Sequence, residues 1–224
     1  MDLAKVSVRQ LNQALHDLPT GTKLRHWKVL NPRGAHAIAC GLNVPVTIEI
    51  NGHAGYYCAG MNQQATVIIH GNTGVGVAEN MMSGCVHVKG NASQSAGATG
   101  HGGLLVIDGD ASARCGISMK GMDILVKGSV GHASAFMAQA GNLVVAGDAG
   151  EALGDSIYEA RIFVRGKTKD LGSDCVEKEI RAEHLDFLEK IFKRTKVKFK
   201  PREFRRYGSA RQLYNFHVEH VGKY

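Results

Sequence analysis

The sequence predicts an all-β protein: a right-handed parallel β-helix of seven 19-residue coils, with an N-terminal capping helix and a C-terminal helix plus an extended tail. The first observation is a glycine that recurs seven times at a spacing of 19 residues without an insertion. These repeat glycines are Gly52, Gly71, Gly90, Gly109, Gly128, Gly147 and Gly166. The second observation is that the positions four and two before each repeat glycine are all aliphatic. Alternation of this kind before a glycine predicts a short strand with one buried face, followed by a turn.

The rest of each unit predicts that these strands stack as coils of a solenoid. After a strand of about five residues, a 19-residue unit has little room for a helix with its loops. The residues seven after each repeat glycine are all small, and those two after it are small or β-branched. Small residues at a fixed phase let neighbouring coils approach closely, and glycine adopts turn conformations that other residues resist. The right-handed sense follows the general preference of parallel crossovers.

The segments that flank the repeat are expected to close the open ends of the rod. Ser7 to Gln10 forms a capping-box pattern and leucines follow at helical spacing, so a helix is expected to begin there. Apolar residues between Ile180 and Phe192 predict an amphipathic helix of about 15 residues. The predicted organisation is an N-terminal helix and lead-in segment over residues 1–30, the β-helix over 31–175, and a C-terminal helix with a basic aromatic tail over 176–224.

Composition limits the cellular context and the chemistry of the chain. The net charge of the 224 residues is +7, but ten lysines and arginines stand against two acids between Glu189 and Arg211, so the rest is close to neutral. The five cysteines form no CxxC pair, which argues against zinc or iron–sulfur binding and is typical of buried thiols in a reducing cytoplasm. No apolar run is long enough to span a bilayer and the N-terminus lacks a signal-peptide pattern. We therefore expect a soluble, cytoplasmic protein.

Several motifs that could carry chemistry are explained better by the repeat. Gly74–Gly76 and Gly100–Gly103 superficially resemble phosphate-binding loops, but no helix follows either of them. Six histidines occupy different phases of the repeat and are not expected to converge on a metal ion: His36, His53, His70, His87, His101 and His132. Eight carboxylates are spread over the turns, and the sequence leaves open whether any two pair for hydrolase or lyase chemistry: Glu49, Glu79, Asp108, Asp110, Asp148, Glu151, Asp155 and Glu159. We predict no catalytic, cofactor-binding or metal-binding residue in this chain.

The position three before each repeat glycine should face outward, and its character changes along the rod. In the first three coils it is Glu49, Ile68 and His87. In the last four coils it is apolar, and these residues form the outer column: Val106, Leu125, Val144 and Phe163. Four consecutive apolar residues on an outer face imply that something covers them. Two covers are open: the chain's own C-terminal helix, or a partner subunit for which the column is an interface.

The basic aromatic tail is the other candidate partner interface. Its candidate residues are Arg205, Arg206, Tyr207, Arg211, Tyr214 and Phe216. Basic residues interleaved with aromatic ones are the usual pattern of nucleic-acid binding. However, the tail is a specific, non-repetitive string, which favours docking on a partner protein or an acidic cofactor region over nucleic acid. A solvated, charged extension is the third alternative.

The coils also carry a family resemblance. The strings INGHAGYYCAG, HGNTGVGVAENMMSG and VKGNASQSAGATGHGG are similar to the glycine-repeat (GXGXG) β-helix domain at the C-terminus of the glutamate synthase large subunit. The preceding NPRGAHAIACGL is similar to the segment that leads into that domain, and the similarity covers residues 27–175. The chain resembles even more closely the stand-alone repeat subunit of N-methylglutamate synthase and of related glutamate-synthase-like complexes. In those subunits a string similar to FRRYGSARQLYNF closes the chain.

This resemblance implies a non-catalytic structural subunit. In the family, the chemistry lies on an amidotransferase-like subunit and on an FMN-binding glutamate-synthase-like subunit with an iron–sulfur cluster, and the β-helix holds them together. FMN and the cluster are therefore expected on a partner. The complex would convert methylamine and L-glutamate to N-methylglutamate and ammonia. The alternatives are the β-helix subunit of formylmethanofuran dehydrogenase, or a nucleic-acid-binding module that uses the basic tail.

Overall fold

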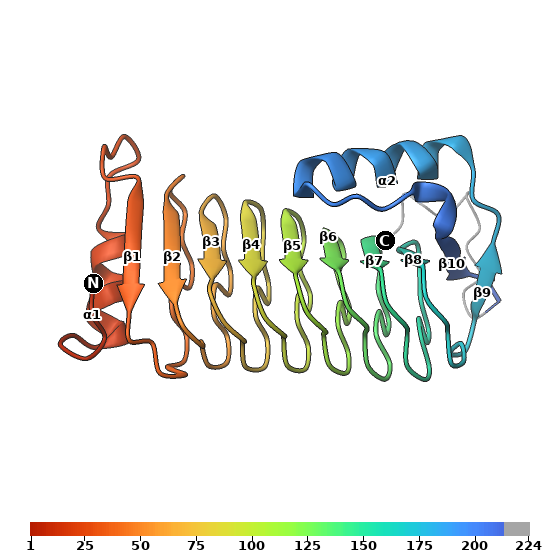
Figure 1. Cartoon of the computed structure of the whole chain (residues 1–224), viewed down its shortest axis with the longest axis horizontal. Helices are drawn as coiled ribbons and strands as arrows, with labels where there is room; N and C mark the ends of the chain where they lie inside the picture. Colours follow the sequence, from red (N-terminus) through yellow and green to blue (C-terminus); the bar gives the residue numbers. More distant parts are fainter. Residues whose placement is uncertain (213–224) are drawn as a thin grey trace, which may run out of the picture.

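The computed structural model describes residues 1–212, which form a parallel β-solenoid with a helix near each end (Figure 1). The helices are α1 (Val8–His16), α2 (Ala182–Thr195) and the short 3-10 helix η1 (Pro201–Glu203). The strands are β1 (His26–Leu30), β2 (Thr47–Asn51), β3 (Thr66–Ile69), β4 (Cys85–Val88), β5 (Leu104–Ile107), β6 (Lys120–Val126), β7 (Ala140–Val145), β8 (Arg161–Val164), β9 (Cys175–Lys178) and β10 (Arg205–Ser209).

One wall of the solenoid is a sheet in the order β1-β2-β3-β4-β5-β6-β7-β8-β10-β9. Strands β1 to β8 are parallel to one another. From β2 to β8 residues pair with those 19 positions later, as Ile48 pairs with Val67, except at the start of β6, where the register shifts and Lys120 pairs with Ala140. The predicted parallel β-helix is therefore confirmed, and the period of the glycines is the period of the strand register.

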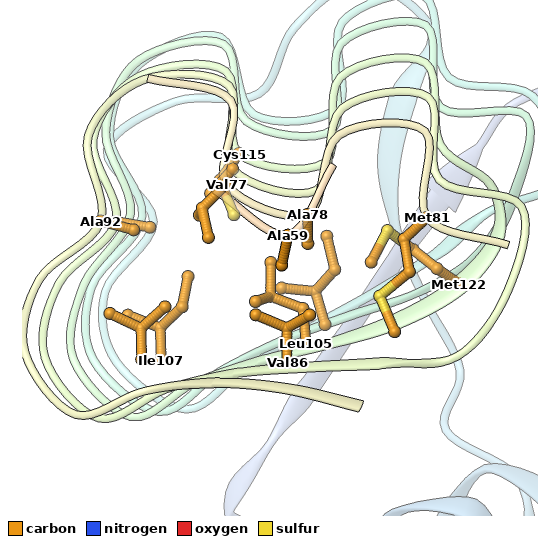
Figure 2. Packing of buried hydrophobic residues seen from close by; sticks show 14 of the residues in the cluster. Ala59, Val77, Ala78, Met81, Val86, Ala92, Leu105, Ile107, Cys115 and Met122 are labelled. Carbon is orange, nitrogen blue, oxygen red and sulfur yellow. The ribbon is translucent and has the colours of Figure 1, made fainter. Parts of the chain in front are cut away.

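The interior of the coils is filled by hydrocarbon. All fourteen aliphatic residues at the positions four and two before the repeat glycines are 0% exposed. Figure 2 shows Ala59 and Ala78 on the opposite wall pointing toward the Val86 and Leu105 side chains of the sheet. Each fully buried aliphatic side chain contributes roughly 1.5–3 kcal/mol relative to exposure. Stacking the coils is therefore what stabilises the rod.

The wall opposite the sheet uses left-handed backbone at alternate residues. In the coil of Gly52, Tyr57 and Ala59 have φ angles of 58° and 55°, and the corresponding residues of the next five coils also have positive φ. Their N–H groups bond to opposite neighbours: that of Tyr57 donates to the carbonyl of Val75 (2.8 Å) and that of Ala59 to the carbonyl of Ile38 (2.9 Å). A buried residue in this conformation has to be small, which explains the alanines and glycines seven after each repeat glycine.

The repeat glycines serve a different purpose from the one the sequence suggested. Only Gly52, with φ of +137°, has a backbone conformation that favours glycine, and none of the six later ones has positive φ. At Gly147, an added Cβ would lie 2.6 Å from the carbonyl carbon of Gly128 in the preceding coil. The expectation that these glycines supply turn conformations is therefore wrong from Gly71 onward. They are needed because successive turns stack too closely for a side chain.

Helix α1 closes the first coil. The predicted capping box is confirmed: Gln10 N–H donates to Ser7 Oγ (3.2 Å), and Ser7 N–H donates to Gln10 Oε1 (2.8 Å). Further along the helix, Asn12 Nδ2 donates to the carbonyl of Ala37 (2.7 Å) and Asn12 Oδ1 accepts from Ala39 N–H (2.9 Å). The side chain of Asn12 thus makes the hydrogen bonds with this backbone that a preceding coil would otherwise make.

The C-terminal end is closed in a way the sequence did not indicate. Residues 205–209, expected to belong to an extended tail, form β10, which inserts antiparallel between β8 and β9. Tyr207 points into the core with 2% exposure, and its hydroxyl accepts a hydrogen bond from Thr168 Oγ1 (3.1 Å). This part of the tail is therefore an internal strand of the sheet.

Candidate interaction surface

The outward-facing side of the sheet is divided into a covered and an uncovered half. Helix α2 lies over the side chains of β5 to β8, whereas Figure 1 shows no helix of the described residues over β2 to β4. The two halves differ in chemistry as well as in cover, because the outward position holds Glu49, Ile68 and His87 in the early coils and only apolar residues in the later ones.

The outer column is buried beneath α2. Its side chains are at most 3% exposed: Val106, Leu125, Val144 and Phe163. They share one hydrophobic cluster with side chains of α2 and the segment after it, including Leu188, Ile191, Phe192 and Phe204. Of the two covers left open by the sequence, the structure shows the chain's own helix. These four residues are not free for a partner, since α2 already removes them from solvent.

Of the three aromatic residues predicted for an interface on the tail, the structure describes Tyr207, which is buried. Tyr207 is a core residue: it pairs with Ile162 on β8 and packs in the hydrophobic cluster inside the coils. Tyr214 and Phe216 lie outside the described residues.

The arginines of the tail remain at or near the surface. Each binds another part of the chain: Arg205 Nη2 donates to the carbonyl of Gly166 (3.1 Å), Arg206 Nη1 to the carbonyl of Glu179 (3.1 Å), and Arg211 Nη2 to the carboxylate of Glu159 (3.1 Å). Arg205 and Arg211 are exposed, whereas Arg206 is half-buried. Among the predicted tail residues that the structure describes, the arginines are therefore the accessible ones.

The basic charge is concentrated on the outer side of α2 and on the segment that follows it. We call these exposed residues the basic surface: Lys190, Lys193, Arg194, Lys196, Lys198, Lys200 and Arg202. Such a surface attracts an acidic partner and speeds its association. The basic surface lies on the same side of the rod as the covered half of the sheet, because α2 forms that cover.

In the uncovered half, Glu49 lies between two histidines on neighbouring strands. His26 Nε2 is 2.8 Å from Glu49 Oε1, and His70 Nε2 is 3.6 Å from Glu49 Oε2. The hydrogen bond from His26 holds the pKa of Glu49 below its ordinary value. All three side chains are partly exposed, so this group adds little stability but presents donors and acceptors to the solvent.

A second polar group surrounds Asp108. Its carboxylate is 2.7 Å from Lys127 Nζ, 2.8 Å from His87 Nε2 and 3.5 Å from Lys89 Nζ. Burial raises the pKa of Asp108, but the hydrogen bonds from Lys127 and His87 outweigh it and hold that pKa below its ordinary value. Burial also lowers the pKa of His87. Together with the group around Glu49, these residues form what we call the polar half of the sheet.

The polar half was not singled out from the sequence, although the signal was present. Glu49 and His87 are the polar members of the outward position, and Asp108 lies one before its glycine, a position that also faces outward. His70 lies one residue before its repeat glycine and His87 lies three before its own, so their positions in the repeat differ by two. Residues at positions two apart on a strand point to the same face of the sheet. Within residues 1–212, no three potential ligands converge to hold a metal ion.

Two of the carboxylates considered for hydrolase or lyase chemistry hold the turns instead. Asp110 Oδ1 accepts from Ser129 N–H (2.7 Å), and Asp148 Oδ1 accepts from Lys167 N–H (2.7 Å). These bonds belong to a ladder in which the side chain one after each repeat glycine accepts from the backbone 19 residues later. Its acceptors are His53, Asn72, Asn91, Asp110, Ser129 and Asp148.

The cysteines are free thiols, and all but the half-buried Cys85 are buried. Burial raises the pKa of Cys40 to about 11 and the pKa values of Cys115 and Cys175 to about 12. A thiol needs to be deprotonated to act as a nucleophile or a metal ligand. These three therefore behave as small apolar side chains at neutral pH.

His184 ties down the first turn of the helix that covers the outer column. It is 4% exposed, and its Nδ1 accepts a hydrogen bond from Arg181 N–H (2.9 Å). Burial, and after it the positive charge of Arg206, lowers the pKa of His184. Protonation of Nδ1 would remove this acceptor and place a charge under the helix.

We expect the stability of the protein to decrease in mild acid because of His184. The unfolded chain binds this proton more readily than the folded chain, so the contribution is complete above the ordinary histidine pKa of about 6.5 and is lost as the pH falls below it. His184→Gln keeps an acceptor without titrating and should flatten the decline between about pH 7 and pH 5 in urea unfolding. His101→Gln, at an exposed histidine, is the control. Equal pH slopes for the wild type and His184→Gln would rule out this role.

No helix within residues 1–212 is both long and apolar enough to cross a lipid bilayer. Comparison with known proteins finds a full-length relative: the chain is 57% identical over 225 residues to Protein GlxC of Rhizobium meliloti (strain 1021), with 100% of this chain and 99% of that protein covered. No protein-family model matches the chain, and no solved structure matches it.

Proposed function

The chain belongs to the family of Protein GlxC, and from this premise and the surfaces described above we propose that it is a non-catalytic structural subunit of a glutamate-synthase-like complex. Its place in such a complex is supported by the resemblance of its coils to the glycine-repeat domain of glutamate synthase. The tail supports the stand-alone form of that domain, because the resembling string FRRYGSAR is the segment that forms β10 and closes the rod.

The complex is proposed to be an N-methylglutamate synthase, which converts methylamine and L-glutamate to N-methylglutamate and ammonia. An amidotransferase-like subunit and an FMN-binding, iron–sulfur subunit would carry the chemistry. The role of this chain would be to fix their relative orientation, so that a small amine passes between them without loss.

The observation that carries the assembly role is that one rod presents two exposed surfaces of different chemistry. The polar half displays histidine, carboxylate and lysine side chains on the open sheet, and the basic surface displays cations on α2 and the segment after it. The coils between them are held by continuous backbone ladders and a packed interior. Two such surfaces at a fixed separation fit a subunit that binds two partners.

Co-expression with the proteins encoded by the neighbouring genes tests this proposal. We expect the chain to co-elute with them in size-exclusion chromatography, at a larger mass than the chain alone. The double reversal Lys193→Glu and Lys196→Glu should weaken the association at least about tenfold, since reversed charges repel an acidic partner. Lys5→Glu, at an exposed lysine near the other end of the chain, should leave it unchanged.

Elution of the chain alone, in the presence of both partners, would contradict the assembly role. Binding to DNA or RNA that weakens steeply with salt and disappears when residues 189–224 are deleted would instead favour the nucleic-acid alternative. The basic surface is the feature that keeps this second candidate open.

A further inference from the structure

Two half-buried arginines lie on neighbouring strands close to the first turn of α2. Arg161 is on β8, and Arg206 is on β10, where it pairs with Phe163. Arg161 lies two residues before Phe163 on the same strand, so both arginines lie on the outward face. The Phe163 ring is 6.1 Å from the ring of His184 in the first turn of α2. Arg206 is therefore opposite Phe163 and Arg161 is two residues from it, on the face of the sheet next to the first turn of α2.

Within residues 1–212, neither of these arginines forms an ion pair with a carboxylate. Arg161 Cζ lies 5.8 Å from the centre of the Phe187 ring. Arg206 Nη1 donates to a neutral carbonyl, and its buried Nε has no hydrogen-bond partner among the described residues. Burial, followed by the charges of Arg161 and Arg181, lowers the pKa of Arg206.

The carboxylates closest to these two arginines are exposed or bound to other residues. Glu179 is 77% exposed and pairs with Arg181 (3.4 Å), and Glu183 is 59% exposed and lies 3.9 Å from His184. Asp123, two strands from Arg161, accepts a hydrogen bond from Asn142 Nδ2 (2.7 Å); burial raises the pKa of Asp123, and the charge of Arg161 acts against that shift. Asp123 attracts Arg161 and Glu183 attracts Arg206 at longer range, but neither carboxylate forms an ion pair with them.

We propose that Arg161 and Arg206 form a binding site for a small oxyanion, of the phosphate or carboxylate class. A guanidinium presents N–H donors in a planar fork that matches two oxygen atoms of such an anion. An oxyanion between the two arginines would accept the unused Nε–H of Arg206 and offset the repulsion of like charges. The arrangement goes beyond the assembly role, because it assigns a free small ligand to the chain itself.

Titration of the full chain with inorganic phosphate tests the site, against sodium chloride of equal ionic strength. We expect saturable binding by calorimetry, and a thermal stabilisation by phosphate that chloride does not produce. Arg161→Gln should weaken phosphate binding about tenfold or more, since it removes a charge-assisted pair of donors. Arg165→Gln is the matched control, because Arg165 directly follows β8 and its guanidinium also lies over a phenylalanine ring, that of Phe199 (4.6 Å). It should bind phosphate like the wild type.

NMR spectra of the arginine Nε–H groups, recorded on the wild-type protein, make the test independent of how the variants fold. Phosphate should shift the resonances of Arg161 and Arg206 and leave that of Arg165 in place. No saturable binding, equal losses in both variants, or equal shifts of all three resonances would overturn the proposal, since the last two indicate only general attraction of anions to the basic chain. Failure of this test would leave the co-elution experiment unaffected, because that experiment does not use either arginine.

Discussion

Replacing Leu125 with aspartate is expected to lower the free energy of unfolding by about 3–5 kcal/mol. Leu125 is 0% exposed, between Val106 and Val144 on the sheet and beneath the apolar face of α2. A carboxylate there either stays charged without a partner or is protonated at a cost, and it also loses the packing of the leucine. Urea unfolding measures the loss.

Leu24→Asp is the matched control for this substitution. Leu24 is 65% exposed, so the same chemical change should alter the stability by no more than about 0.5 kcal/mol. Hydrogen exchange of α2 should accelerate in Leu125→Asp, because the helix loses its apolar seat. If the Leu125→Asp chain were as stable as the wild type and hydrogen exchange of α2 were unchanged, the outer column would not be covered by α2 in solution. The column would then again be a candidate interface for a partner.

Replacing Gly147 with alanine should destabilise the protein by about 2–4 kcal/mol, which is a large effect for one methyl group. The new Cβ would lie 2.6 Å from the carbonyl carbon of Gly128 and 2.6 Å from Ser129 Oγ. The backbone of Gly128 cannot move aside without separating two coils. The backbone hydrogen bonds between these coils, on both sides of the contact, would therefore lengthen. Thermal or urea unfolding measures the effect.

Gly21→Ala provides the comparison, because a Cβ at Gly21 meets nothing within 4 Å. Its stability should stay within about 0.5 kcal/mol of the wild type. Similar losses in both variants would mean that the entropy of the unfolded chain, and not the spacing of the coils, is responsible.

The repetitive part of this fold was predictable because one environment recurs every 19 residues. A position such as the one four before the glycine is seen seven times in the sequence, so its burial is indicated by seven independent side chains. The non-repetitive parts offer no such averaging. The pairing of Tyr207 with the sheet depends on contacts with residues about 40 positions away, such as Thr168, and no local pattern reports them.

The candidate surfaces were predictable only in part, for a similar reason. Apolar residues on the outward position indicate that a cover exists, but the hydrophobic effect has no direction and does not identify the cover. Phe163 is compatible with the chain's own helix and with a partner until the packing of Phe187 against it is known. The group around Asp108 depends on the register of three strands, which becomes clear once the 19-residue repeat is laid out as a sheet.

The insertion of β10 between β8 and β9 has a consequence for how the protein is made. During synthesis each coil can stack on the previous one as soon as it leaves the ribosome, because its partner is the segment made just before. The last part of the sheet cannot, since β9 is made before the strand that separates it from β8. A chain that stops before residue 205 would keep β8 as an open edge, which invites pairing with other chains. The rod is therefore closed only after the segment that forms β10 has been made and has inserted between β8 and β9.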